Sequence, residues 1–392
     1  MIRISIPYLI TIGVSALLLV IGHNIAVIGM YESPNNQYET VKARVQNTPQ
    51  KIVPDYNFLD DYDEEEINSF MAAQGDRIVF EAKILDGPGK GRIVIAEQTF
   101  SPLLIDRSKE VKKGDSVILI NNELGWYFGG YVRINSILVL GILFALCLLL
   151  FGGMKGFNTI LSLGLTCAAV FAVFIPSILS GKNIYIMSLL VCAFTTSIVP
   201  LIVMGYNKKS LASIVGCAAG IVVAGIITLI MDKALYLTGI VDEHSRYLVS
   251  LPGDIKLNLN AIIFAGITIG AIGAIQDVSI SLASALWEIK ENVSKIKFKE
   301  LLKSGYNIGR DIIGTMANTL ILAYIGSSLT LVLLLSVYSG SPLALFNSEM
   351  FAVEVLQALA GSLGILFAMP LTAVFCSIIY LKDMKKDRNR QE

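Results

Sequence analysis

Residues 266–288 read GITIGAIGAIQDVSISLASALWE and carry one acidic residue deep inside an apolar run, Asp277. The stretch is long enough to cross a bilayer, and it contains no Lys or Arg that could neutralise the carboxylate. An ionised carboxylate at the centre of a membrane helix costs on the order of 3 kcal/mol even on lenient scales. Because such groups usually mark paths for ions or substrates, the surroundings of Asp277 are the first question.

Small residues accompany Asp277 on one side of the expected helix. Helical spacing predicts one narrow stripe, which consists of Gly266, Gly270, Gly273, Asp277, Ser281, Ser284 and Glu288. Small residues let another backbone approach closely, so we expect this stripe to pack against protein or to line a wet cleft. Two interpretations stay open: a tight helix-packing face that contains one polar residue, or a functional carboxylate. The second is favoured.

Polar partners for Asp277 are available in the following stretch, NIGRDIIGTMANTLILAYIGSS. Its cytoplasmic end carries Arg310 and Asp311, and one face continues through Thr315, Asn318 and Thr319. Hydroxyl and amide groups at membrane depth need partners, so this face is expected to meet the Asp277 stripe. Arg310 fits equally well as a simple helix-end residue at the interface.

A third polar face is expected in the last apolar stretch, which begins MFAVEVLQALAGSLGILFAMPLT. Glu354 should lie near the outer surface, Gly361 should pack against another helix, and Pro370 should kink this one. The candidate relay residues are therefore Asp277, Arg310, Asp311, Thr315, Asn318 and Glu354.

The composition indicates an α-helical multi-pass membrane protein, because 54% of residues are hydrophobic and only 16% are charged. About eight spans are predicted, at roughly 5–28, 134–153, 157–179, 184–205, 210–231, 259–287, 310–337 and 352–381. The first apolar run is too long for a signal peptide and is interpreted as an uncleaved anchor within residues 1–30. Seven spans then fill residues 133–382.

Lys and Arg predict the orientation. With the N-terminus inside, the cytoplasmic segments after the second span hold fourteen Lys or Arg residues, and the short outer loops hold four. Both termini are therefore expected in the cytoplasm of a bacterial cell, and residues 31–132 outside it. The polar segment 289–308 is expected to form an amphipathic helix at the cytoplasmic interface, and 383–392 a basic tail.

Residues 31–132 are predicted to form a small β domain of the OB or SH3-like barrel kind. The run RIVFEAKILDGPGKGRIVIAEQ is typical of a hairpin, since two alternating stretches flank a Gly/Pro turn. The acidic run 60–66 could bind a divalent cation, but its spacing matches no fixed ligand pattern, and a solvated surface is favoured. The five Cys all lie in apolar runs, so no metal site is expected.

The chain resembles the YibE/F-like family of bacterial membrane proteins. The resemblance rests on AGITIGAIGAIQDVSISLASALWEIKE, NIGRDIIGTMANTLILAYIGSSL and EVLQALAGSLGILFAMPLTA, and it covers most of residues 130–380. Gln276 stands where the family usually has another residue. A weaker similarity in the order of segments links the chain to resistance-nodulation-division permeases and to the SecD/SecF export subunits, in which membrane carboxylates relay protons.

Two functions follow as expectations. The first is a secondary transporter or permease for an unknown small solute or ion, coupled to a proton or cation through Asp277. The second is a non-transporting accessory protein for export or envelope assembly. An enzyme is not expected, because only His23 and His244 occur and there is no HExxH motif or P-loop. No cofactor and no nucleic acid are expected; the partners would be the bilayer and either a second copy or a paralogue.

Overall fold

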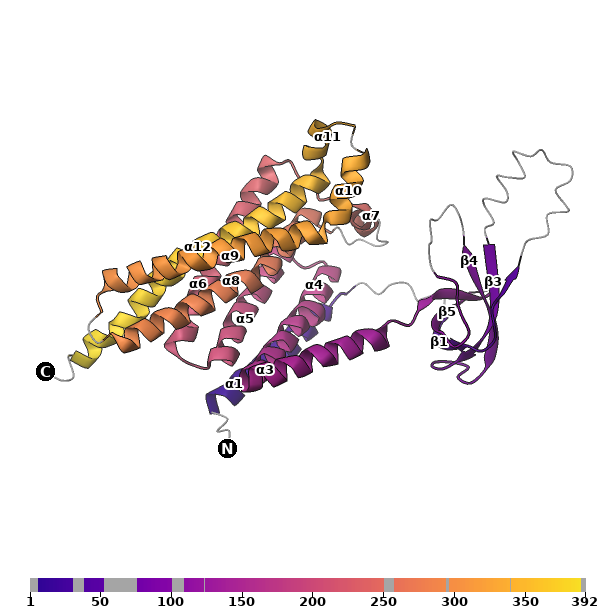
Figure 1. Cartoon of the computed structure of the whole chain (residues 1–392), viewed down its shortest axis with the longest axis horizontal. Helices are drawn as coiled ribbons and strands as arrows, with labels where there is room; N and C mark the ends of the chain where they lie inside the picture. The colour runs from indigo at the N-terminus through magenta and orange to yellow at the C-terminus, as the bar shows by residue number, and fades with distance from the viewer. Residues whose placement is uncertain are drawn as a thin grey trace. The chain divides into compact units, whose positions relative to one another are not determined.

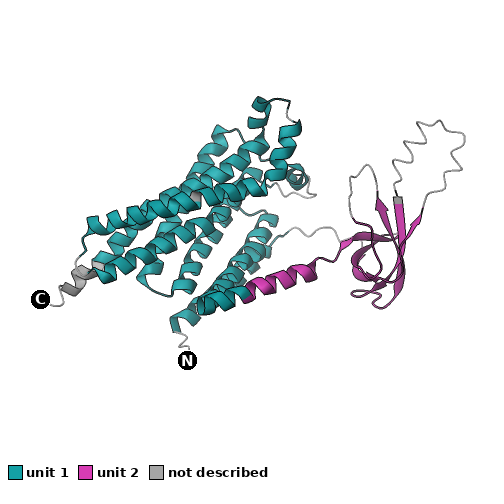
Figure 2. Cartoon of the chain, in the orientation of Figure 1, with its two compact units in different colours: residues 1–31, 147–392 teal, residues 32–146 magenta. Residues whose placement is uncertain are grey.

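The computed structural model describes residues 6–30, 39–52, 76–100, 109–122, 124–249, 257–293, 296–338 and 340–388. The chain divides into two compact units, residues 1–31 with 147–392 and residues 32–146 (Figure 2). The acidic run at 60–66 lies outside the described residues. Each unit is considered by itself.

The unit at residues 32–146 contains a small β barrel. Its strands are β1 (Glu39–Val45), β2 (Gln50–Ile52), β3 (Asp76–Ile84), β4 (Ile93–Phe100), β5 (Ser116–Asn122) and β6 (Gly125–Tyr131). Five of them pair in the order β1-β5-β6-β4-β3, and β1 also pairs with β3, which closes the barrel. All pairs are antiparallel except β4 with β6. This is the strand order of an OB fold, so the barrel prediction is confirmed.

Alternating side chains form the barrel core. In β1, for example, Val41, Ala43 and Val45 are buried while the residues between them are exposed. The predicted hairpin is confirmed as β3 and β4, whose turn places Gly87, Gly89 and Gly91 at positive φ. Glycine adopts that backbone conformation without strain, which explains the Gly-rich turn.

Most helices of the described chain are long and predominantly apolar (Figure 1). They are α1 (Ile6–Val27), α3 (Ile134–Ala168), the π-helical η3 (Ala169–Phe174), α4 (Ile175–Leu179), α5 (Ile184–Met204), α6 (Lys208–Ala234), α7 (Glu243–Val249), α8 (Leu259–Asn292), α9 (Phe298–Ser327), α10 (Leu329–Tyr338), α11 (Pro342–Phe346) and α12 (Glu349–Arg388).

Six helices of the described chain are long and apolar enough to cross a membrane, or seven if the bent pair α9–α10 is one span. That number counts residues Ile134–Leu179 once. Gly153 is not helical there, and a Cβ on Gly156 would overlap the carbonyl oxygen of Leu148. In a straight helix these two residues would be about 12 Å apart, so the chain turns back at Gly153. If residues Ile134–Leu179 form two spans divided at Gly153, and α9–α10 forms one more, the total is the predicted eight. That number stays a prediction.

The centre of the helical unit is formed by α6, α8 and α12, with α9 beside α8 and α12 (Figure 1). Close packing depends on glycine: a Cβ added at Gly220 of α6 would lie 2.7 Å from Ala368 of α12 and 2.9 Å from Ile275 of α8. Small residues that bring backbones together are typical of helices associating in membranes.

The N-terminal helix α1 is held near both ends by polar contacts. Tyr8 donates to Asn158 Oδ1 at 2.8 Å, and at the other end Lys182 Nζ donates to the carbonyls of Ile25 and Ala26 at 2.5 and 3.1 Å. The last carbonyls of a helix have no partner within it, so Lys182 satisfies groups that lipid cannot.

The expected separate helix over 289–308 is not present. Residues 289–292 complete α8, and α9 begins at Phe298 and continues without a break to Ser327. Glu300 accepts the Lys297 backbone N–H at 3.0 Å and so helps to start α9. Charged side chains on the exposed side of a helix do not interrupt its backbone hydrogen bonds, so polarity alone misplaced the boundary. The helix α12 likewise continues to Arg388, into the expected tail.

Candidate functional site

Asp277 lies near the middle of α8, eighteen residues after Leu259 and fifteen before Asn292. Its side of the helix is exposed. The opposite side of α8 is fully buried in the bundle at Ile267, Ile275, Leu282 and Leu286. Asp277 forms no hydrogen bond or ion pair with any residue that the structure describes. The helix therefore presents an unpaired carboxylate outward from its own chain.

The stripe of small residues is also exposed, at Gly266, Gly270, Gly273 and Ser281, while Ser284 is half-buried and Glu288 exposed. A Cβ added at Gly266 or Gly273 would meet nothing within 4 Å. Only Gly270 is approached, by the hydroxyl of Tyr324 in α9 at 3.1 Å. The described part of the chain thus does not supply the packing partner that the sequence predicts for most of this stripe. Gly361 differs, since Leu320 and Ala271 pack against it.

The structure places α9 beside α8, as expected, but it does not join their polar groups. Arg310, Asp311, Thr315, Asn318 and Thr319 are all exposed. Thr315 and Thr319 donate to carbonyls of their own helix, at 2.9 and 2.8 Å. No hydrogen bond connects any of these five to Asp277 in the described chain.

The depths of these groups can still be compared through two contacts between the antiparallel helices. Gly305 of α9 lies against Leu286, and Tyr324 of α9 lies against Gly270. Halfway between these contacts, residues 314–315 of α9 stand level with residue 278 of α8. Thr315 is therefore at about the depth of Asp277.

Glu354 lies in a different part of the helical unit from Asp277. It is half-buried in α12, five residues after the helix begins, and accepts a hydrogen bond from the hydroxyl of Ser328. Ser328 separates α9 from α10, and the two helices are bent by 59° there. Glu354 therefore holds a bend between helices and takes no part in the surroundings of Asp277.

Behind Asp277, the bundle holds a buried polar layer that the sequence interpretation missed. Gln276 is 5% exposed and donates to the Thr195 carbonyl of α5 at 3.2 Å. Ser279 accepts from Thr372 of α12 at 3.2 Å, and Thr195 Oγ1 is buried without a partner in the described chain. The sequence does show serines and threonines in several apolar runs. It does not show that they come together in the folded chain.

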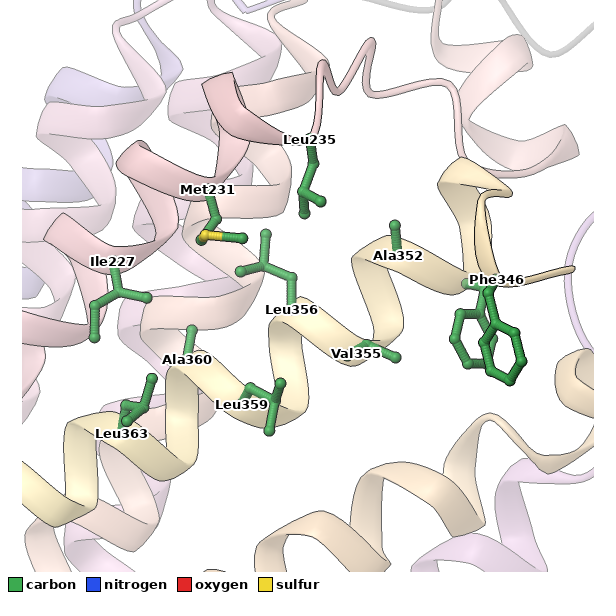
Figure 3. A pocket seen from close by; sticks show the side chains of 11 residues that line it. Ile227, Met231, Leu235, Phe346, Ala352, Val355, Leu356, Leu359, Ala360 and Leu363 are labelled. Atoms are coloured by element: carbon green, nitrogen blue, oxygen red, sulfur yellow. The ribbon is translucent and has the colours of Figure 1, made fainter. Parts of the chain in front are cut away.

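One apolar pocket of about 300 Å³ lies between α6, α11 and α12 (Figure 3). Its labelled side chains include Ile227 and Met231 of α6, Phe346 of α11, and Leu356 and Leu359 of α12. All of the described residues that line it are apolar, so none of them offers a group for chemistry or ion binding. Among the described residues, no group of three or more His, Cys, Asp or Glu could hold a metal ion.

The family model for YibE/F-like proteins matches residues 140–382, which include α5 to α11 and most of α12. The chain belongs to the YibE/F-like family. Asp277, its stripe and the polar face of α9 all lie in the matched region of this YibE/F-like protein, and the β barrel lies outside it. The match gives no support to the weaker similarity to resistance-nodulation-division permeases. No match is found among curated proteins or among solved structures.

Proposed function

We propose that this YibE/F-like protein is a secondary transporter of the bacterial cell membrane, in which Asp277 carries a proton or a coupling cation. The observation that carries the proposal is the carboxylate near the middle of α8, which is exposed and has no hydrogen-bond or ion-pair partner among the described residues of its own chain. Ionisable side chains inside a membrane are expensive and persist mainly where ions or substrates pass.

The surroundings of Asp277 support an ion path better than a structural role. A structural carboxylate at membrane depth would be bound to donors from its own bundle, as Glu354 is to Ser328. Asp277 instead stands beside open glycine positions, with Thr315 at about its depth on the next helix. Thr315 and Asn318 are proposed to line the path and to exchange hydrogen bonds with the passing ion.

The proposed orientation follows from the distribution of Lys and Arg. Both termini and the connection between α8 and α9 face the cytoplasm, and the barrel unit faces outward. Asp277 would then lie between the two membrane surfaces, accessible to protons from either side as the bundle changes conformation.

The test is ion movement in liposomes that contain the purified full-length protein. A pH-sensitive dye inside the vesicles would report proton entry under an imposed potential, and sodium or potassium gradients would test cation coupling. Asp277→Asn keeps the size of the side chain but cannot titrate. It should reduce proton flux by about a hundredfold or more, which is the usual loss when a proton-transferring group is removed. Glu288→Gln, at the end of the same stripe, is the matched control and should retain the flux.

A second candidate is an accessory protein for export or envelope assembly that does not transport. The observation that favours it is the OB-type barrel, which exposes Ile93 by 60% and Ile95 by 68%. Ile93 and Ile95 lie on the same face of β4, and contiguous exposed apolar surface is a feature of binding sites. Wild-type vesicles that move no ion or solute under any gradient would favour this candidate over the transporter.

A further inference from the structure

Polar side chains that face outward at membrane depth need a partner that lipid does not offer. On α8 these are Asp277 and Ser281, and on α9 they are Arg310, Asp311 and Asn318. Within the described chain, none of the five forms a side-chain hydrogen bond or an ion pair. An unpaired charge or amide in hydrocarbon costs several kcal/mol, so this surface is not a stable lipid-facing surface.

Opposite charges occur on this surface at nearby depths. The contacts of Gly305 with Leu286 and of Tyr324 with Gly270 place Arg310 level with about residue 282 of α8. Arg310 is therefore about 7 Å from Asp277 along the membrane normal, at 1.5 Å per residue. An extended Arg side chain can cover that offset, because its flexible stem carries the guanidinium well away from the backbone.

We propose that a second copy of this chain covers α8 and α9, and that Arg310 of each copy pairs with Asp277 of the other. The proposal rests on the membrane location given under the proposed function, and it names the group that faces Asp277 there. It does not require that transport occurs.

Charge complementarity selects a second copy as the occupant. A two-fold axis along the membrane normal keeps every residue at its own depth, so the surface of one copy meets the same depths on the other. An apolar partner would leave both Asp277 and Arg310 unpaired, whereas a second copy pairs each of them once and gives two ion pairs across the dimer. The open positions at Gly266 and Gly273 allow the close helix approach that such pairing needs.

Two single variants that carry different affinity tags test the pairing between chains. Asp277→Arg and Arg310→Asp each leave two like charges facing one another in a homodimer. When both variants are expressed together, the mixed dimer restores an Arg–Asp pair at both sites. We expect capture through one tag to recover the other variant at least about tenfold more than either variant recovers itself, since like charges across an interface cost several kcal/mol. Equal recovery in all combinations would overturn the pairing, because a pair within one chain gives no preference for the mixed dimer.

A cysteine experiment on the otherwise native surface covers the case in which the charged variants fail to fold. The five native cysteines are changed to Ala, and Gly273→Cys is introduced into the full-length chain. Oxidation in native membranes should yield a disulfide-linked dimer, while Val222→Cys, 53% exposed on α6, should not. A monomer throughout, or cross-linking at Val222→Cys in place of Gly273→Cys, would overturn the proposal. Loss of ion flux would leave this result unaffected, so the two proposals fail separately.

Discussion

Gly220 and Gly364 bring α6 and α12 together on either side of Ile275, whose side chain lies 2.9 and 2.8 Å from the positions of their missing Cβ atoms. Gly220→Ala should therefore destabilise the bundle, because its new methyl would also lie 3.0 Å from a backbone oxygen. Overpacking of this kind typically costs about 1–3 kcal/mol. The measurement is the thermal midpoint of the purified protein in detergent.

Gly164→Ala is the matched control for this substitution. Nothing lies within 4 Å of its added Cβ, and Ala is a better helix former than Gly by about 1 kcal/mol. Its thermal midpoint should stay unchanged or rise. A fall of equal size in both variants would show that the loss of glycine, and not the contact with Ile275, is responsible.

Sequence reasoning located the residues of the candidate site but not all of their neighbours. Asp277 and its glycine stripe follow from helical periodicity, and the structure does place Ile275 and Leu282 on the opposite, buried side of α8. The hydrogen bond from Gln276 to Thr195 could not be predicted, because it joins two residues that lie on different helices and are eighty-one positions apart in the sequence. Whether a stripe is covered depends on tertiary and quaternary contacts, which periodicity does not encode.

At the scale of elements, one acidic residue ties the connection after α6 to the start of α12. Glu349 accepts from the backbone N–H groups of Thr238 and Gly239 at 2.6 and 2.7 Å and from the Thr238 hydroxyl at 2.8 Å. Glu349→Ala removes all three bonds and should cost about 1–2 kcal/mol locally, since hydrogen bonds to a charged group are worth more than neutral ones but these are partly exposed.

Limited proteolysis is a direct readout of that local loss. Cleavage between residues 235 and 249 should become several-fold faster in Glu349→Ala than in the wild type, because the connection opens more often. Glu243→Ala, an exposed acidic residue in α7 with no side-chain hydrogen bond among the described residues, should not change the rate. Equal rates for all three proteins would show that Glu349 does not restrain this connection.

The ends of helices and strands are predictable where the hydrophobic pattern of the sequence ends at the same place as the element. The β3–β4 hairpin follows from alternation and a glycine turn, and α5 and α6 begin and end close to their predicted spans. The segment 289–308 differs, because its polarity and amphipathic pattern predict a separate surface helix while the structure divides it between α8 and α9. A helix that extends beyond the bilayer carries polar residues without interruption, so polarity indicates the membrane boundary and not the helix boundary.

At the scale of the whole molecule, the two units have separate hydrophobic cores. The barrel core consists of Val41, Ala43, Val45, Phe80, Ala82, Ile84, Ala96, Val111, Val117 and Leu119. All of these described core residues belong to the unit at residues 32–146. The helical unit has its own clusters, the largest around α8 and α12. Separate cores indicate that each unit is stabilised mainly by its own contacts.

The barrel should therefore fold when residues 31–132 are expressed alone. A core of this size gives a free energy of unfolding of only a few kcal/mol, and the expected result is a β-type circular dichroism spectrum with one cooperative thermal transition. Phe80→Ala, at a position 1% exposed, should cost about 3–5 kcal/mol and abolish the transition. Ile95→Ala, at a position 68% exposed, should leave the transition nearly unchanged. An isolated segment without a cooperative transition would mean that the barrel depends on the membrane unit or on a partner. The exposed side chains of Ile93 and Ile95 would then be the first surface to test for that contact.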